Sequence, residues 1–204
     1  MNNIVVKEGF DYGRNLMDGI LSGPIKTTQP GSLKHLLWGE NRSEQSMVIK
    51  FGRNFEKWFE FFIKHEKSPT NLTLLPSGVH RETKTDRDLL AIDEARKFVY
   101  YRELKANIEL DTEKLPATIE KIKRVKEHLK AEYSGYKIDA GCLCWSTYDE
   151  IALARKFKSK INSFQKASVT LDFAEDFFEF IGVPMKKQTY YDYFKELGRK
   201  IRNG

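Results

Sequence analysis

The sequence predicts an α/β domain in which helices flank a mixed β-sheet. Apolar residues recur at helical spacing over residues 43–65 and again over about 116–133. Short apolar runs over 89–92, 98–105 and 136–147 are instead typical of buried strands. The resulting order of helix, strands, helix, strand and helices is the one expected when helices cover a sheet in layers.

The composition describes one globular domain over residues 1–204. Hydrophobic residues make up 40% of the chain and charged residues 31%, which is typical of a protein with a packed core. No apolar run approaches the ~18 residues of a membrane span, and the start "MNNIVVKEGFDYGR" lacks the features of a secretory signal. We therefore expect a cytoplasmic protein without a membrane partner. The net charge of +6 is compatible with a polyanionic partner but does not require one.

The first part of the chain, about residues 1–42, is expected to be an irregular arm or a long surface loop, with room for one short helix. Residues 18–43 are rich in Gly, Pro, Ser and Thr, with a short apolar cluster around Leu36 and Trp38. An amphipathic helix is predicted from Ser43 to about His65, with apolar positions at Met47, Phe51, Phe55, Trp58, Phe59, Phe62 and Ile63. A turn and a short apolar strand follow over 68–78.

The second half of the chain is predicted to contain a helix, a strand and further helices. The helix runs from about Pro116 to Tyr133, and a Ser-Gly pair ends it. The strand over 136–147 holds Cys142 and Cys144, whose spacing fits neither a disulfide nor a zinc site, so we expect reduced thiols. The part from about 147 to 204 is expected to be helical, in segments over 148–164, 171–183 and 188–202.

The segment "DLLAIDEARKFVYYRELK", residues 88–105, predicts a β-hairpin whose open end carries charged residues. Its strands are 89–92 and 98–105, and a turn near residues 95 and 96 places Asp88 opposite Glu103, with a register uncertain by a residue or two. Side chains alternate along a strand, so Glu103 and Lys105 share one face and Leu104 points to the other. Two opposed carboxylates repel each other unless a proton or a cation lies between them.

These residues suit a divalent metal site. Mg²⁺ takes oxygen ligands and keeps several waters, so two carboxylates, Asp88 and Glu103, are enough to hold it. The ammonium of Lys105 could then reach the attacking water or the scissile phosphate of a phosphodiester. A plain surface hairpin with a Glu–Lys pair explains the same residues. Asp86 could replace Asp88 if the register slips, whereas Asp93 is better explained as a turn residue.

The same residues resemble the signature of the PD-(D/E)XK nucleases. The continuation "ELKANIELDTEKLPAT" is similar to type II restriction endonucleases with an E-L-K-x-N element followed by L-D-T-E-K, and the resemblance covers about residues 50–125. Arg87 stands where the signature has proline. The resemblance implies a restriction-endonuclease-like mixed β-sheet core flanked by helices. It also implies Mg²⁺, replaceable by Mn²⁺, on Asp88, Glu103 and the backbone carbonyl of Leu104, with Lys105 completing the catalytic group.

A further acid is expected from the helix before the hairpin, because this family often has a G-x-x-x-E pattern there. Gly52 and Glu56 match that pattern, and we assign Glu56 to the catalytic group. Glu60, one turn later, is the alternative. Both residues could equally face solvent on an amphipathic helix.

Three segments are candidates for DNA contact. Asn107, Thr112 and Lys114 lie around the start of a helix, where amides and a lysine suit phosphate, although ordinary capping also explains them. Arg155 and Lys158 belong to a basic run without an intervening acid. The helix over 116–133 carries a mixed-charge face that suits solvent or phosphate, formed by Glu120, Lys121, Lys123, Arg124, Lys126, Glu127 and Lys130.

The expected function is therefore that of a type II restriction endonuclease, which hydrolyses double-stranded DNA at a short specific sequence. A homodimer is expected because two strands must be cut, and a cognate DNA methyltransferase would be a functional but not a physical partner. One alternative keeps the fold but makes the chain a repair, recombination or phage nuclease that recognises DNA structure. A non-catalytic DNA-binding domain is the other.

Overall fold

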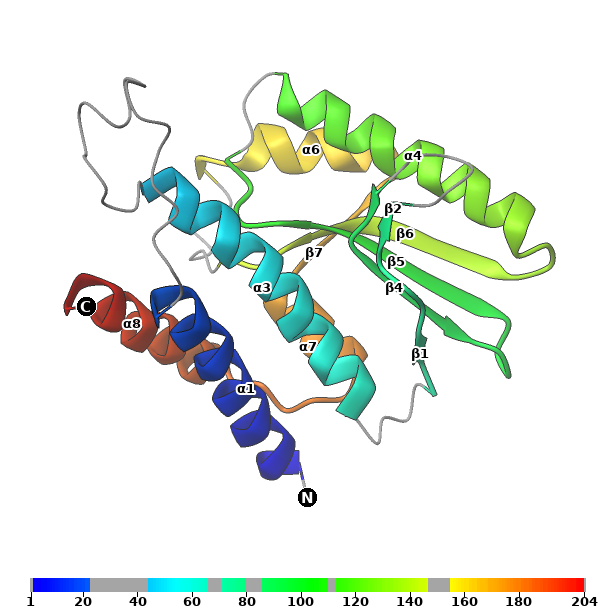
Figure 1. Cartoon of the computed structure of the whole chain (residues 1–204). Helices are drawn as coiled ribbons and strands as arrows, with labels where there is room; N and C mark the ends of the chain where they lie inside the picture. Colours follow the sequence, from blue (N-terminus) through cyan, green and yellow to red (C-terminus); the bar gives the residue numbers. More distant parts are fainter. Residues whose placement is uncertain are drawn as a thin grey trace.

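A mixed five-stranded β-sheet lies at the centre of the molecule (Figure 1). Its strand order is β1-β4-β5-β6-β7, formed by Thr73–Leu74, Leu89–Asp93, Phe98–Lys105, Lys137–Cys144 and Thr170–Phe173. The pairs β1–β4 and β4–β5 are antiparallel, whereas β5–β6 and β6–β7 are parallel. Strands β2 (Gly78–Val79) and β3 (Asp86–Arg87) form a separate two-stranded ladder. The predicted α/β class with a mixed sheet is therefore confirmed.

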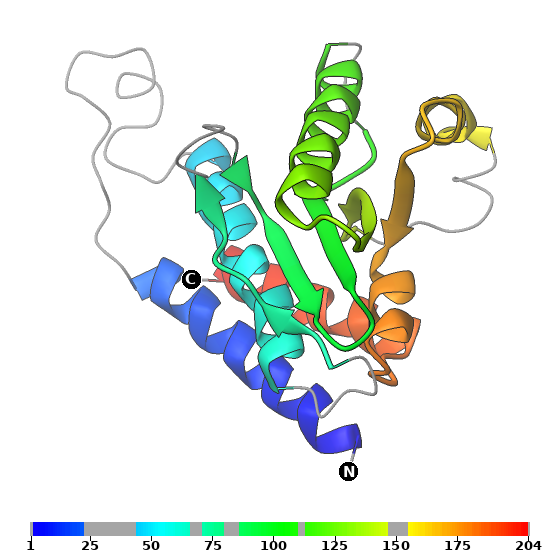
Figure 2. The same cartoon turned by 90° about the vertical axis from the view of Figure 1, so that its right-hand side faces the viewer.

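The structure is a computed structural model that describes residues 2–22, 44–65, 71–79, 86–109, 113–146 and 155–203. Its helices are α1 (Asn2–Ser22), α3 (Glu44–His65), α4 (Lys114–Glu132), α6 (Lys158–Lys166), α7 (Ala174–Phe180) and α8 (Lys187–Asn203). Figure 2 shows α4 and α6 on one face of the sheet and α3 and α7 on the other. Helices α1 and α8 pack with α3 as a further helical layer.

Side-chain alternation along the strands divides the core between the two faces of the sheet. Leu89 and Ala91 of β4 join the large cluster formed with α1, α3, α7 and α8. Leu90 and Ile92 join the cluster formed with α4 and α6. Both faces of β4 are therefore covered, which explains why its sequence is apolar from Leu89 to Ile92 and does not alternate with polar residues.

The β4–β5 hairpin has the predicted register. Leu89 lies opposite Arg102 and Ile92 opposite Val99. Asp93 acts as the predicted turn residue, because its Oδ1 accepts the backbone N–H of Arg96 at 3.0 Å. The hairpin therefore brings residue 88, just before β4, to the same end as residues 103–105 of β5.

The prediction of an irregular arm over residues 1–42 is wrong for residues 2–22, which form helix α1; residues 23–43 lie outside the described part. The helix buries Phe10, Met17 and Ile20 against the α3 layer. Two glycines permit this contact, since a Cβ at Gly9 would overlap the ring of Phe62 and a Cβ at Gly13 would overlap the side chains of Tyr193 and Trp58. The sequence of α1 is thus amphipathic, but the glycines on its buried face lower its helix propensity, so the sequence pattern did not indicate a helix there.

The prediction of a wholly helical part over 147–204 also needs correction. Thr170–Phe173 form the edge strand β7, which pairs with β6 before α7 begins at Ala174. The aromatic residues of α7 follow β7 directly, so the spacing of apolar residues over 171–183 indicated one continuous helix. The predicted helices over 43–65 and 116–133 are confirmed as α3 and α4, with ends shifted by one or two residues.

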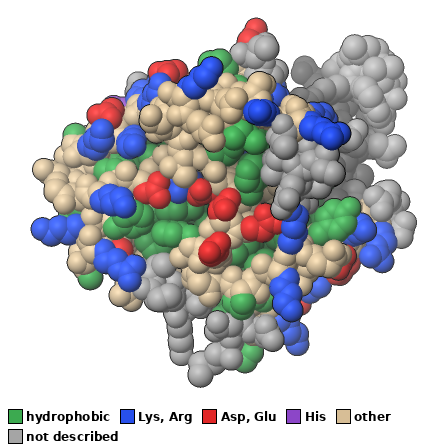
Figure 3. Space-filling view, turned by 180° about the vertical axis from the view of Figure 1, so that it is seen from behind, with side chains coloured by type: hydrophobic (Ala, Val, Ile, Leu, Met, Phe, Trp, Pro, Cys, Tyr) green, Lys and Arg blue, Asp and Glu red, His purple; other side chains and the backbone are tan. Residues whose placement is uncertain are grey.

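Cys142 and Cys144 are buried free thiols, as predicted. None of the helices in the described ranges is long and apolar enough to span a bilayer. Acidic side chains gather near the middle of the face seen in Figure 3, with basic side chains around its edge. That face is therefore not uniformly basic, despite the net positive charge of the chain.

Candidate active site

Asp88 is fixed to the end of strand β5 by a backbone hydrogen bond. It lies in the bend between β3 and β4 and is 9% exposed. Its Oδ2 accepts the N–H of Leu104 at 2.8 Å. The N–H and C=O of a residue in an extended strand point to the same edge, so the carbonyl of Leu104 also lies on the Asp88 side. The hairpin thus places two kinds of oxygen, carboxylate and carbonyl, at one edge.

Glu103 is the most buried acid of this group, at 2% exposure. Its Oε1 accepts a hydrogen bond from the Nζ of Lys105 at 2.7 Å, and its Oε2 accepts one from the hydroxyl of Tyr101 at 2.9 Å. Burial opposes the charged form, but the ammonium groups of Lys105 and Lys121 outweigh it and lower the pKa of Glu103. The carboxylate is therefore ionised and fixed in place.

Lys121 of α4 is the second cation of the site. Its Nζ lies 2.5 Å from Oε2 of Glu103 and 3.7 Å from Oδ1 of Asp88. The sequence indicated this lysine only as part of a mixed-charge helix face. A signal was present, because positions 118, 121 and 125 share one side of α4 and Thr118 and Val125 are buried there. A lysine beside an apolar stripe faces the sheet and not open water.

Lys105 ends β5 on the same face of the sheet as Glu103. Burial alone would lower the pKa of Lys105, but the neighbouring Glu103 carboxylate outweighs this and raises it. Lys105 is thus a fixed positive charge at the open edge of the hairpin, which is the predicted arrangement of Glu103 and Lys105.

Glu56 of α3 lies close enough to these acids for their charges to change its pKa. Burial and the nearby carboxylates of Asp88, Asp86 and Glu103 raise the pKa of Glu56 to about 7. Burial and Glu103 likewise raise the pKa of Asp88 to about 6. Burial and the neighbouring carboxylates both disfavour the charged forms of Glu56 and Asp88, and a cation bound between the carboxylates would stabilise those forms.

Glu60 has a different environment. Its Oε1 accepts a hydrogen bond from Ser77 at 2.7 Å, and its Oε2 lies 3.6 Å from Lys64. Asp86 is exposed in the β3 ladder. Of the two helix acids considered, Glu56 is therefore the one whose charge interacts with Asp88 and Glu103.

The donor set suits a hard divalent cation held partly by water. Among the residues that the structure describes, no three His, Cys, Asp or Glu side chains are grouped to hold a metal. Mg²⁺ does not need such a cage, because one or two carboxylates, waters and a substrate phosphate commonly complete its shell. Asp88 and Glu103 supply two carboxylates, and the Lys121 ammonium now lies against both. Positive charge is therefore stabilised between these two carboxylates.

The candidates for DNA contact fall into two places. Asn107 is exposed, and its Oδ1 accepts the N–H of Glu109 at 3.0 Å. Lys156 lies 3.8 Å from Glu109, which brings the exposed Arg155 and Lys158 segment against this loop. Those candidates therefore share one neighbourhood.

Lys114 is exposed at the first residue of α4. Two turns of the same helix separate it from Lys121, which reaches the acidic cluster. The N-terminal part of α4 thus carries both an exposed lysine and, two turns later, the lysine that contacts the site. Thr112 lies outside the described residues.

Comparison with known proteins gives no relative for this chain. A scan against protein-family models, a search of curated proteins and a search of solved structures each found no match. The geometry and chemistry of the site therefore have to indicate its function.

Proposed function

We propose that this chain is a Mg²⁺-dependent endonuclease with a restriction-endonuclease-like fold, acting as a type II restriction enzyme on double-stranded DNA. One observation carries the proposal: Asp88, Glu103 and Lys105 meet at the end of a hairpin, with Asp88 bonded to the N–H of Leu104. A surface hairpin has no need to bury two carboxylates at 9% and 2% exposure.

Each residue of the cluster has a part in the proposed hydrolysis. Asp88, Glu103 and the carbonyl of Leu104 would hold Mg²⁺, and Mn²⁺ could replace it. When bound, the ion offsets charge that develops on the phosphate and polarises the attacking water. Lys105 places its ammonium beside the phosphate oxygens and stabilises their charge. Glu56, with a pKa of about 7, is suited to accept a proton from that water near neutral pH.

Lys121 has to move in this scheme. The Lys121 ammonium forms an ion pair with Oε2 of Glu103, so it would have to leave that oxygen for a metal ion to bind there. A lysine side chain is long and flexible enough to turn toward a phosphate of the bound DNA. Lys121 thus compensates the carboxylates before DNA binds and contacts the backbone afterwards.

Cleavage of unmethylated phage-length DNA tests the proposal. The wild-type protein is compared with Glu103→Gln, in Mg²⁺ and in EDTA, and Glu120→Gln on the exposed face of α4 makes the same charge change away from the site. Discrete Mg²⁺-dependent fragments, lost only with Glu103→Gln, support a type II enzyme. A smear lost in the same variant favours the alternative of a nuclease directed by DNA structure. Folded wild-type protein that cuts nothing with Mg²⁺ or Mn²⁺ rejects the nuclease. We also propose that the protein acts as a homodimer, because two DNA strands must be cut. Sedimentation of the protein with a cognate duplex tests this.

A further inference from the structure

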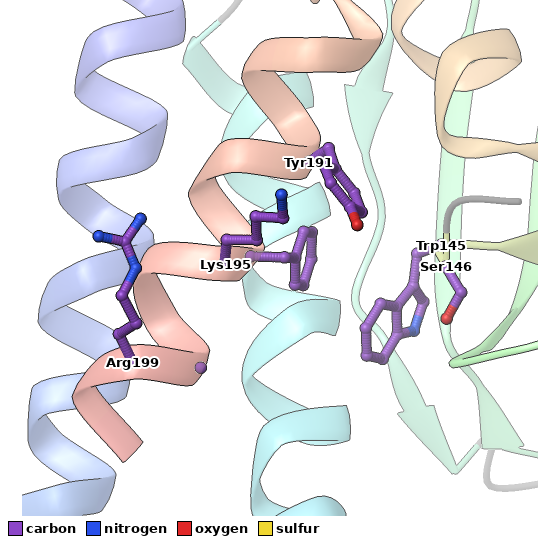
Figure 4. A pocket seen from close by; sticks show the side chains of 7 residues that line it. Trp145, Ser146, Tyr191, Lys195 and Arg199 are labelled. Atoms are coloured by element: carbon purple, nitrogen blue, oxygen red, sulfur yellow. The ribbon is translucent and has the colours of Figure 1, made fainter. Parts of the chain in front are cut away.

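A pocket of about 540 Å³ lies between the end of β6 and helix α8 (Figure 4). Its volume falls within the ~300–1,000 Å³ typical of small-ligand sites. Aromatic side chains of Trp145, Tyr191 and Phe194 line it, together with the cationic Lys195 and Arg199. Flat aromatic surface beside positive charge suits a ligand that has both a planar ring and an anionic group.

The aromatic wall of the pocket is a stack of nearly parallel rings. Phe55 of α3 lies 4.3 Å from Trp145 and 5.0 Å from Phe194 by ring centroids, with an interplanar angle of 23° in both pairs. Phe55 is buried, whereas Trp145 and Phe194 are half-buried, and Tyr191 is 44% exposed. The half-buried Trp145 and Phe194 therefore bring the stack to the surface, where another planar ring could extend it.

The cationic wall belongs to one face of α8. Tyr191, Lys195 and Arg199 are spaced by four residues, so they form a single stripe along the helix. The Nζ of Lys195 lies 4.5 Å from the centroid of the Tyr191 ring. Within the described ranges, neither Lys195 nor Arg199 has an ion-pair partner.

The acids of α8 do not neutralise this stripe. Asp192 accepts a hydrogen bond from Gln188, and Glu196 bonds with Arg14 of α1. The charge at the pocket is thus positive, and it complements an anionic ligand.

The pocket adjoins the acidic cluster through the backbone. The N–H of Trp145 donates to the carbonyl of Lys105 at 3.1 Å, and the N–H of Ser146 donates to the carbonyl of Ala106 at 2.9 Å. On α3, Phe55 directly precedes Glu56. The pocket therefore lies at the same end of β5 and β6 as the acidic cluster, within reach of a DNA strand held there.

We propose that this pocket binds one unpaired nucleotide of a DNA strand, with the base stacked on the aromatic wall and the phosphate at Lys195 and Arg199. The inference rests on the proposed function, because DNA is taken as the partner. Aromatic side chains beside cations are the usual means of holding single-stranded nucleic acid without reading its sequence. An unpaired nucleotide arises at a flap or gap, or when a base leaves its duplex.

Fluorescence of a short single-stranded oligonucleotide with one 2-aminopurine tests this site. The titration is made in EDTA so that no strand is cut. Stacking of the probe base in the pocket should quench its fluorescence. Tyr191→Ala, and separately the double variant Lys195→Ala/Arg199→Ala, should weaken binding by about tenfold. Lys187→Ala, which removes a positive charge from α8 outside the pocket, is the matched control and should bind like the wild type.

Two results would overturn the inference. One is equal affinity of the double variant and Lys187→Ala, which would leave the pocket without a part in binding. The other is equal affinity of the free 2-aminopurine deoxynucleotide and the oligonucleotide, which would indicate a site for free nucleotides. Retained binding by a protein that cuts no DNA would reject the nuclease proposal but keep the pocket assignment.

Discussion

The ammonium of Lys121 on α4 forms an ion pair of 2.5 Å with Oε2 of Glu103 on β5. This contact joins a helix to a strand, and the same ammonium lies 3.7 Å from Asp88. Glu103 is 2% exposed, so its charge would be costly without such partners. The pair therefore makes the metal-free site stable, and at the same time it occupies an oxygen that a metal ion would use.

We expect Lys121→Met to lower the free energy of unfolding by about 1–3 kcal/mol in EDTA, because two buried carboxylates lose a cation. Mg²⁺ should then raise the melting temperature of the variant more than that of the wild type. Calorimetry with and without Mg²⁺ measures both effects. Lys123→Met is the control, since Lys123 forms an exposed pair with Glu120 on the same helix. A Mg²⁺ response equal to that of the wild type would show that Lys121 does not compete for the site.

Lys105→Met should reduce the cleavage rate by about 100-fold or more while leaving Mg²⁺ bound, because in the proposed mechanism the lysine acts on the phosphate and is not a metal ligand. Single-turnover cleavage gives the rate, and titration calorimetry of the same sample gives the metal affinity. Parallel loss of both quantities would instead make Lys105 a support for Glu103. A cleavage rate near that of the wild type would remove Lys105 from the catalytic group.

Glu56→Gln should stabilise the metal-free protein at pH 8. The folded-state pKa of Glu56 is raised to about 7, so its contribution to stability is fully present below its ordinary pKa and lost as the pH rises through 7. The neutral variant avoids that loss and should gain about 1–2 kcal/mol at pH 8, after allowance for solvent screening, and little at pH 4. Urea unfolding at both pH values measures the difference.

Glu60→Gln is the matched control for that experiment. Glu60 lies one turn further along α3 and bonds with Ser77 and Lys64. Removing its charge should give no gain at pH 8. An equal gain from both variants would mean that the net charge of the helix, and not the acidic cluster, sets the effect.

Gly9→Ala should destabilise the protein by about 1–3 kcal/mol, because its Cβ would overlap the ring of Phe62 across the α1–α3 contact. Gly19→Ala provides the opposite case on the same helix, since no atom lies within 4 Å of its added Cβ. That change should stabilise α1 by up to about 1 kcal/mol through helix propensity. Thermal unfolding of both variants checks the predicted change of sign. Equal effects would contradict the packing of α1 on α3.

The hairpin was predictable from the sequence because its register depends on local information. A four-residue turn and two apolar strands fix the pairing of Leu89 with Arg102, and with it the position of Asp88 beside Glu103 and Leu104. The assignment of Glu56 over Glu60 rested on a family pattern and not on physical chemistry. The structure surrounds Glu56 with the charges of the site.

Features that depend on distant parts of the chain were not predictable in the same way. Lys121 reaches Glu103 only because α4 crosses back over the sheet; the local pattern indicates that this lysine faces the sheet, but not which residue it contacts there. Helix α1 gains its stability from α3 and α8, so its glycines lower its helix propensity without preventing its formation. Strand β7 exists because β6 supplies an edge for it. The pocket at Trp145 likewise requires α3, β6 and α8 together.

The contact between Arg14 of α1 and Glu196 of α8 has a consequence for synthesis on the ribosome. Helix α1 is translated before α3, yet the helix that lies beside it is not made until residues 187–203 have been translated. Trp58 and its neighbours on α3 therefore lack their full cover throughout that interval. The hairpin, α4 and β6 are close in sequence and can associate earlier. We expect the nascent chain to complete its α4 side first, while the aromatic layer between α1, α3 and α8 is exposed to chaperones until translation has passed α8.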